Sequence, residues 1–206
     1  MKKWHLISGF AAAMAFAASA NAGIWSEVGD AGDLPGTAQT AVGAGSLDQI
    51  DGALAGGADM YRICITSPST FSADTNGGAS FDTQLFLFDL NGVGVLANDD
   101  SGTLQARLPA GSFTLAAGEY YLAISGFDRD PVDAGGNLIF PTFPFGGVYG
   151  PIDGDSIAGW AGGSGGGQYS IFLTGAAFCN PVPEPTGVLL GLLGLAGLHS
   201  ARRRVG

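Results

Sequence analysis

The feature of this chain that most constrains its fold is a series of short apolar runs that recur about every ten residues. Turn-forming Gly, Asp and Asn residues separate these runs, and no segment between residues 23 and 181 sustains the 3.6-residue period of an amphipathic helix. This pattern predicts an all-β domain, an antiparallel β-sandwich or jelly roll. The predicted strands cover residues 60–66, 85–88, 93–97, 104–108, 112–116, 119–125 and 169–174.

Two of the runs also indicate which faces are buried. In the run 60–66, Tyr61, Ile63 and Ile65 lie on one face of the predicted strand. The run 85–88 is apolar on both faces, which is typical of a central strand covered on both sides. The segments 23–57 and 128–167 are rich in Gly, Pro and Asp, and we expect them to be loops.

The N-terminal residues have the organisation of a secretory signal peptide. Lys2 and Lys3 precede the apolar stretch 6–18, and the small-residue site Ala20-Asn21-Ala22 follows. We therefore expect signal peptidase to remove residues 1–22 and to leave Gly23 as the mature N-terminus. The folded part would then lie outside the cytoplasm.

The C-terminal residues 181–206 have the organisation of a membrane-associated sorting segment. An extended polar break comes first, then the apolar stretch 186–201, then a basic cluster. As a helix the apolar stretch would span roughly 24 Å, slightly short of a bilayer core, and the basic side chains would remain cytoplasmic. The break consists of Val182, Pro183, Glu184 and Pro185, and the basic cluster of Arg202, Arg203 and Arg204.

This order of elements resembles the PEP-CTERM tail of Gram-negative bacteria. The resemblance implies an inner-membrane intermediate, which an exosortase-type enzyme cuts near Pro183-Glu184-Pro185. The processed protein would then reach the cell surface or the extracellular space. The alternative is a C-terminal membrane anchor that is never cut.

The composition of residues 23–181 excludes several kinds of chemistry. This stretch has no Lys and no His. It contains three Arg and seventeen acidic residues, which gives a net charge of −14. The absence of His excludes a Ser-His-Asp site, a Cys-His site and a His-ligated metal site from this stretch. The absence of Lys excludes a Schiff-base lysine. Nucleic acid would be repelled. We predict that the protein is not an enzyme.

Two patterns that suggest hydrolases do not change this prediction. The stretch 162–166 matches G-x-S-x-G, but it lies in a glycine tract without a histidine partner and is better interpreted as a flexible loop. Paired carboxylates can hydrolyse glycosides, but Glu27 and Glu119 are the only glutamates of the stretch 23–181.

Cys64 and Cys179 form an even pair in a chain expected in an oxidising compartment, which favours a disulfide over two reduced thiols. The bridge would close a loop of about 115 residues.

A second resemblance covers the middle of the chain. The stretches 82–89, 91–92, 97–100 and 117–124 resemble the bacterial pre-peptidase C-terminal domain, and Asp59-x-Tyr61 fits its opening strand. The resemblance implies a noncatalytic β-sandwich that is attached to secreted enzymes or exported alone, and some related domains bind calcium or polymers. We therefore place the sandwich at residues 59–180, preceded by loops and an edge segment at 23–58.

The acidic turns of this region are candidates for a Ca²⁺ site, because Ca²⁺ takes six to eight oxygen ligands. Two consecutive strands connect the turns, so we expect their side chains to converge at one end of the sandwich. The predicted ligands are Asp82, Asp89, Asn91, Asp99 and Asp100. The alternative is that these residues only form Asx-turns. Weaker candidates are Asp128, Asp130 and Asp133, or Asp153 and Asp155.

The sequence therefore predicts an exported β-sandwich with a structural or adhesive role in the cell envelope or in an extracellular polysaccharide matrix. The alternative is a carbohydrate-binding module, either with or without bound Ca²⁺, in which aromatic side chains stack on sugar rings. The candidates for stacking are Phe140, Phe143, Phe145, Tyr149 and Trp160.

Overall fold

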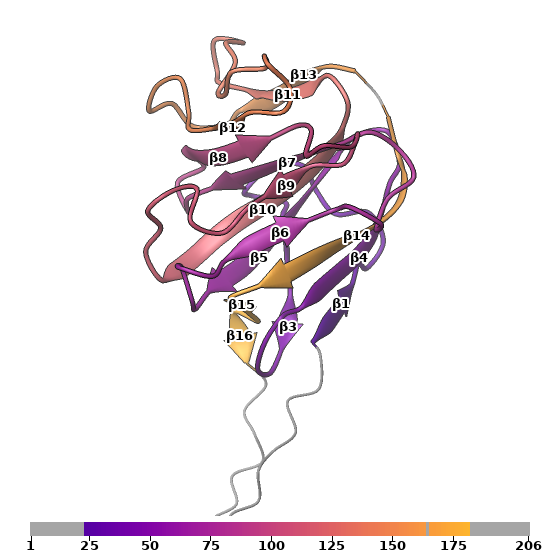
Figure 1. The fold of residues 1–206 in the computed structure, drawn as a ribbon, viewed down its shortest axis with the longest axis vertical. Coiled ribbons are helices and arrows are strands. Elements are labelled where there is room, and N and C mark those ends of the chain that lie inside the picture. The colour runs from indigo at the N-terminus through magenta and orange to yellow at the C-terminus, as the bar shows by residue number, and fades with distance from the viewer. Residues whose placement is uncertain (1–22, 164, 182–206) are drawn as a thin grey trace, which may run out of the picture.

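The computed structural model describes residues 23–163 and 165–181 of the chain. These residues form strands and loops, and no helix occurs among them. Two larger sheets make up the body of the domain, and two short strand pairs lie at its ends (Figure 1). The predicted all-β class is confirmed.

The strands are ordered as follows. The first sheet runs β1 (Ile24–Ser26), β4 (Gln49–Leu54), β14 (Gly167–Thr174), β6 (Ser72–Asp74), β9 (Arg107–Leu108). The second runs β12 (Val148–Tyr149), β8 (Gly94–Asn98), β7 (Thr83–Phe88), β10 (Gly118–Gly126), β5 (Ala58–Ile65), β15 (Ala176–Ala177), with β2 (Gln39–Thr40) also on β5. The short pairs are β11 (Arg129–Val132) with β13 (Gly159–Gly162), and β3 (Val42–Gly43) with β16 (Asn180–Pro181).

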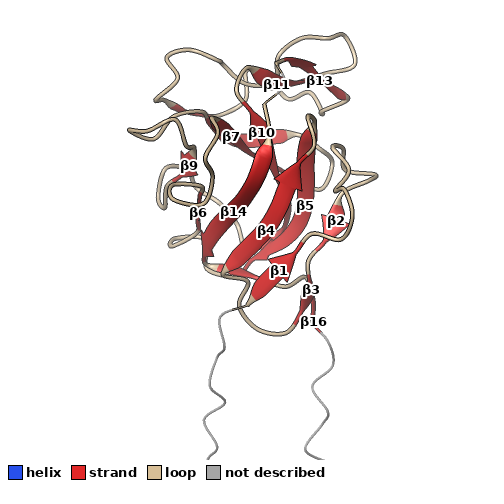
Figure 2. Cartoon of the chain, turned by 90° about the vertical axis from the view of Figure 1, so that its right-hand side faces the viewer, coloured by secondary structure: helices blue, strands red, loops and turns tan. Residues whose placement is uncertain are grey.

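The main core lies between the two sheets. Strand side chains alternate between faces, so each sheet directs one apolar set inward. Strands β4 and β14, which run side by side in Figure 2, contribute Ile50 and Ile171 from the first sheet. The second sheet contributes Ile63 of β5, Leu87 of β7 and Leu122 of β10. All five side chains are fully buried. This packing is that of a β-sandwich.

A second apolar cluster covers the other face of the second sheet. Phe86 and Phe88 of β7 point to this face and pack against Ile139, Phe140 and Ile157. The predicted loop 128–167 is therefore wrong in part, because it contains β11, β12 and β13 and lies over the sheet (Figure 1). This cover explains why β7 is apolar on both faces, as the sequence predicted.

The strand predictions failed at three other places. The predicted loop 23–57 contains β4, an inner strand that pairs with β14 and buries Ile50 and Leu54. Pairing and burial outweigh the low strand propensity of Asp51 and Gly52. In the run 104–108 only β9 is strand, and the run 112–116 forms no strand.

The predicted disulfide is confirmed. Cys64 in β5 is bonded to Cys179, which follows β15, and their Cα atoms are 5.0 Å apart. Strand β15 pairs with β5 so that Ala177 lies opposite Cys64. The bridge therefore fastens the end of the described domain to one of its central strands.

The signals at the two ends of the chain lie outside the described residues. These are the signal peptide with Ala20 and Ala22, the sorting motif Val182-Pro183-Glu184-Pro185 and the basic cluster Arg202-Arg203-Arg204. Gly23 is the first residue described. Among residues 23–163 and 165–181, no helix has the length and apolar character needed to cross a membrane.

Candidate functional site

Three of the five predicted calcium ligands meet at one end of the sandwich. Asp82 immediately precedes β7, and Asp99 and Asp100 immediately follow β8. Because β7 and β8 are antiparallel neighbours, the start of one lies beside the end of the other. Each of the three residues offers a carboxylate oxygen, and these oxygens lie within 4.8 Å of one another. We call Asp82, Asp99 and Asp100 the acidic end cluster.

The carboxylates of the acidic end cluster lack hydrogen-bond donors. The Oδ1 atom of each of the three side chains is buried and has no hydrogen-bond partner among the described residues. Asp99 is only 9% exposed, and Asp82 and Asp100 are half-buried. Neither of the two ion pairs among the described residues includes any of the three, since one joins Arg62 to Glu119 and the other Arg107 to Asp74.

Burial and neighbouring negative charges make the carboxyl groups of Asp99 and Asp82 hard to ionise. Burial raises the pKa of Asp99 to about 7, and the negative charges of Asp100 and Asp82 raise it as well. The pKa of Asp82 is also raised, first by burial and then by the charge of Asp100. Such shifts are expected where carboxylates leave water without gaining a positive partner.

Backbone hydrogen bonds hold the acidic end cluster in place. The Asp100 N–H donates to the Phe145 carbonyl over 3.0 Å, and the Phe127 N–H donates to the Asp82 carbonyl over 3.1 Å. The Asn98 side-chain amide donates to the Asp100 carbonyl over 2.9 Å. The cluster is thus joined to the loops that carry Phe127 and Phe145.

The other two predicted ligands do not belong to this cluster. Asp89 and Asn91 form the turn between β7 and β8, at the opposite end of the hairpin, because six strand residues span about 20 Å. Asp89 Oδ1 accepts hydrogen bonds from the backbone N–H groups of Asn91 and Val93, at 2.8 and 2.9 Å. These contacts are those of an Asx-turn, the alternative that the sequence left open. The expected convergence of all five residues is therefore wrong.

The weaker acidic candidates are dispersed. Asp133 accepts hydrogen bonds from the Asn137 side-chain amide and from the backbone N–H groups of Asn137 and Gly135, and these bonds lower its pKa. Asp130 accepts a hydrogen bond from the Gln84 amide at 3.1 Å. Asp153 and Asp155 are exposed, and so is Asp128, which lies in a turn with a positive φ.

A second buried polar group lies in the main core. The Tyr169 hydroxyl of β14 donates to Asp59 Oδ2 of β5 over 2.6 Å, and the Tyr61 and Tyr169 hydroxyl oxygens are 2.5 Å apart. Asp59 is only 2% exposed. Burial raises the pKa of Asp59 to about 7, the Tyr169 hydrogen bond lowers it, and the charges of Glu27, Asp30 and Asp33 raise it.

The sequence pointed to this core group only through the stretch Asp59-x-Tyr61. It did not indicate that Tyr169 or Glu27 would lie beside Asp59. Carboxylate oxygens of Glu27, Asp30 and Asp59 also lie within 4.8 Å of one another. Unlike the acidic end cluster, however, this group has protein donors: Glu27 accepts hydrogen bonds from the N–H groups of Ala31 and Ala53, at 2.6 and 2.8 Å.

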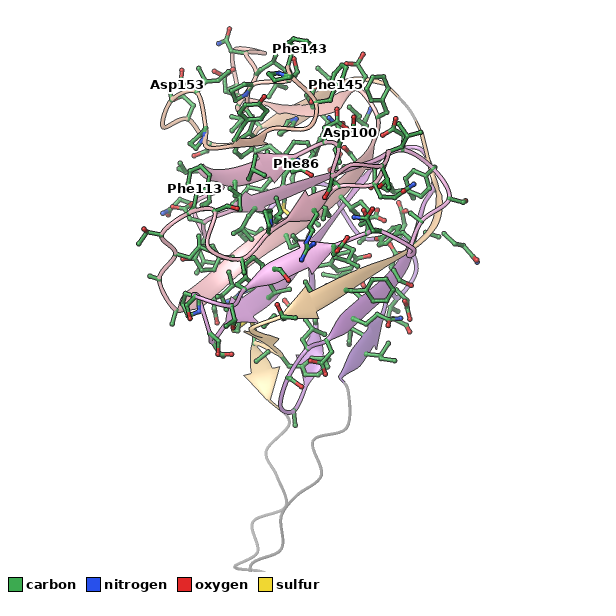
Figure 3. The ribbon with its side chains drawn as sticks, in the orientation of Figure 1. Phe86, Asp100, Phe113, Phe143, Phe145 and Asp153 are labelled. Atoms are coloured by element: carbon green, nitrogen blue, oxygen red, sulfur yellow. A yellow bond between two sulfur atoms is a disulfide. The ribbon has the colours of Figure 1, made fainter. Side chains whose placement is uncertain are left out.

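An exposed aromatic patch lies beside the acidic end cluster. It consists of Phe127, Phe143 and Phe145, which are 41%, 74% and 37% exposed. The Phe145 ring lies 5.6 Å from the rings of both other residues, at interplanar angles of 73° and 86°. Figure 3 shows Phe143, Phe145 and Asp100 at the same end of the molecule.

The predicted stacking residues divide into two groups. Phe143 and Phe145 belong to the aromatic patch, whereas Phe140 is buried against Phe86 and Phe88. Trp160 packs edge-on against Phe86, and its indole N–H donates to the Asp33 carbonyl over 2.8 Å. The half-buried Tyr149 donates to the Pro144 carbonyl over 2.6 Å. Phe140 and Trp160 therefore anchor the 128–167 segment to the sheet.

Phe127 is the member of the patch that the sequence did not indicate. It directly follows β10, where the Phe127 N–H binds the Asp82 carbonyl. A single Phe after a predicted strand carries no signal of its own, since its partners come from residues 143–145.

Comparison with known families supports the second of the two resemblances. Residues 57–126 match the bacterial pre-peptidase C-terminal domain. The matched stretch runs from β5 to β10 and includes the acidic end cluster, and domains of this kind are typical of secreted proteins. A comparison with curated proteins gives no match.

Proposed function

We propose that the protein is exported and sorted through its C-terminal segment, and that it acts as a noncatalytic, adhesive β-sandwich in the cell envelope or the extracellular polysaccharide matrix. Signal peptidase and an exosortase-type enzyme would process the two ends, with an inner-membrane intermediate between the two cuts. The match of residues 57–126 to a domain typical of secreted proteins supports the exported location.

The observation that carries the adhesive role is the aromatic patch. Phe127, Phe143 and Phe145 place three apolar rings together on the surface of a domain that is otherwise strongly acidic. Single exposed apolar residues are common, whereas clustered ones mark contact sites. The disulfide and the two-sided cover of β7 provide a stable support for such a contact.

The alternative function, a carbohydrate-binding module, draws on the same patch. Aromatic rings that stand free on a surface can stack on sugar rings. The rings here meet at 73° and 86°, so they do not form one flat platform along which a sugar chain could lie. This geometry fits an apolar contact better than stacking on successive sugar units.

The test is retention of the purified protein on extracellular matrix, with matrix polysaccharide as a separate fraction. The double substitution Phe143→Ala and Phe145→Ala should reduce retention on whole matrix at least tenfold. Phe113→Ala is the matched control, because Phe113 is similarly exposed in a different loop (Figure 3). Equal retention of all three proteins would contradict the adhesive role, and equal losses on whole matrix and on purified polysaccharide would favour the carbohydrate-binding alternative.

A further inference from the structure

The buried carboxylate oxygens of the acidic end cluster have no partner among the described residues. Buried polar atoms in folded proteins nearly always have a hydrogen-bond partner, yet three carboxylate oxygens from Asp82, Asp99 and Asp100 have none. One carboxylate oxygen of each residue also lies within 4.8 Å of one from each of the others, so the unfavourable desolvation is accompanied by mutual repulsion.

No ion pair among the described residues joins the cluster to a positively charged side chain. The charged neighbours that act on Asp99 are all acidic: Asp100, Asp82, Asp130 and Asp128. The nearby strand β11 begins with Arg129, but its guanidinium donates to the Gly163 carbonyl and forms no ion pair with the cluster. The cluster is thus acidic throughout, and it is partly open to solvent because Asp82 and Asp100 are only half-buried.

We propose that Asp82, Asp99 and Asp100 bind one Ca²⁺ ion. Three unpartnered carboxylate oxygens, with Asp99 nine-tenths buried, form a set of hard oxygen ligands without nitrogen or sulfur. Ca²⁺ accepts six to eight oxygens in flexible geometry, and water can complete the shell on the open side of Asp82 and Asp100. Zn²⁺ and the later transition metals prefer His or Cys, which the cluster does not offer.

The bound ion would act on the aromatic patch as well as on the hairpin. It joins the start of β7 to the end of β8, whose chain continues into Asp99 and Asp100. Asp82 and Asp100 are also hydrogen-bonded to the backbones of Phe127 and Phe145, two of the three patch residues. Ca²⁺ binding therefore fixes the two loops from which the aromatic patch is built.

The test is calorimetric titration of the purified full chain with Ca²⁺ after treatment with a chelator. One ion should bind with a Kd of about 10⁻⁴ to 10⁻³ M, the range of extracellular modules. At a tenfold excess over Kd, the melting temperature should rise by about 3–6 °C. Mg²⁺ at matched ionic strength should give a smaller shift, because it requires a more rigid octahedral shell.

Melting temperatures of substituted proteins distinguish Ca²⁺ binding by the acidic end cluster from a purely structural role of its carboxylates. In chelator, Asp99→Asn should melt at the same or a higher temperature than the parent protein, because it removes the most deeply buried of three mutually repelling carboxylates. In Ca²⁺ it should melt at a lower temperature, because the ligand is lost. Asp82→Asn should behave in the same way, whereas Asp153→Asn, at an exposed position on another loop (Figure 3), should retain the full calcium shift.

Three outcomes would overturn the proposal. The first is the absence of measurable binding at millimolar Ca²⁺. The second is an equal shift with Ca²⁺ and Mg²⁺, which would indicate bulk screening of the acidic domain. The third is a calcium shift that Asp99→Asn and Asp82→Asn both leave intact. None of these outcomes depends on the adhesive role, which the Phe143→Ala and Phe145→Ala protein tests separately.

Discussion

The buried carboxyl group of Asp59 makes the stability of the domain depend on pH in a direction opposite to that of most acidic residues. Burial raises the Asp59 pKa from 3.8 to about 7, so the native state retains a proton that the unfolded chain has lost. The resulting stabilisation is fully present below about pH 4 and is lost as the pH rises through about 7.

The size of the effect follows from the shift. A change from 3.8 to about 7 is roughly three pKa units, and each unit corresponds to about 1.4 kcal/mol. Asp59 alone should therefore lower the free energy of unfolding by up to about 4 kcal/mol between pH 4 and pH 8. Because Asp59 is 2% exposed, solvent screening reduces this figure little.

Asp59→Asn is the matched perturbation, because an amide oxygen can still accept the hydrogen bond from the Tyr169 hydroxyl but does not titrate. Urea denaturation of both proteins from about pH 4 to about pH 8, in chelator, gives the comparison. The two proteins should be similar near pH 4, and the variant should be the more stable near pH 8. The Asp99 contribution is common to both proteins and cancels in the difference.

Tyr169→Phe provides a second check on the cause. The Tyr169 hydrogen bond lowers the Asp59 pKa, so its removal should move the pH at which stability falls to a higher value. Parallel pH profiles for the parent protein and Asp59→Asn would refute the reasoning, since Asp59 would then not be the titrating group.

Three further predictions concern the disulfide, the core and the processing of the ends. Replacing Cys64 and Cys179 together by Ser should lower the free energy of unfolding by about 4–5 kcal/mol, because the bridge closes a loop of about 115 residues, and peptide mapping without reduction should recover the two cysteines linked. Leu87→Ala should cost about 2–5 kcal/mol in urea denaturation, because Leu87 is fully buried between the sheets. Intact mass of the protein recovered from the cell surface should show Gly23 at the N-terminus and no Arg202–Arg204, whereas a retained tail would contradict sorting.

The strands that the sequence predicted well share a long apolar pattern. β5, β7, β10 and β14 each carry several large apolar residues; β14 buries alternate residues, whereas β7 is buried along its whole length because both of its faces are covered. β4 was missed because Asp51, Gly52 and Ala53 break that pattern, and its strand conformation depends on pairing with β14, about 118 residues later in the chain. Local sequence cannot reveal a partner at that separation.

The cover on the second sheet was missed for a related reason. Ile139, Phe140 and Ile157 are isolated apolar residues in a Gly- and Pro-rich segment, so the segment resembles a loop. Phe86 and Phe88 indicate that something must cover the outer face of β7, but not which segment does so. Pattern reasoning therefore established the need for a cover without locating it.

The two ends of the β7–β8 hairpin explain what residue types can and cannot predict about the candidate site. Both ends carry Asp residues next to short polar stretches, so the sequence alone predicts one set of ligands that includes both ends. At the turn, the free N–H groups of Asn91 and Val93 satisfy the carboxylate of Asp89. At the strand ends, the N–H of Asp100 is already bonded to the Phe145 carbonyl, and the carboxylate oxygens of the acidic end cluster find no donor.

The difference between turn and site thus lies in the supply of donors, which only the packed structure determines. A tight turn exposes N–H groups that have no strand partner, and an Asp side chain there satisfies them. Where two strand ends meet under loops that use up the neighbouring N–H groups, the same side chain keeps its negative charge unbalanced. A cation is then the partner that can satisfy several carboxylates together, and Asp82, Asp99 and Asp100 meet this condition whereas Asp89 in the acidic turn does not.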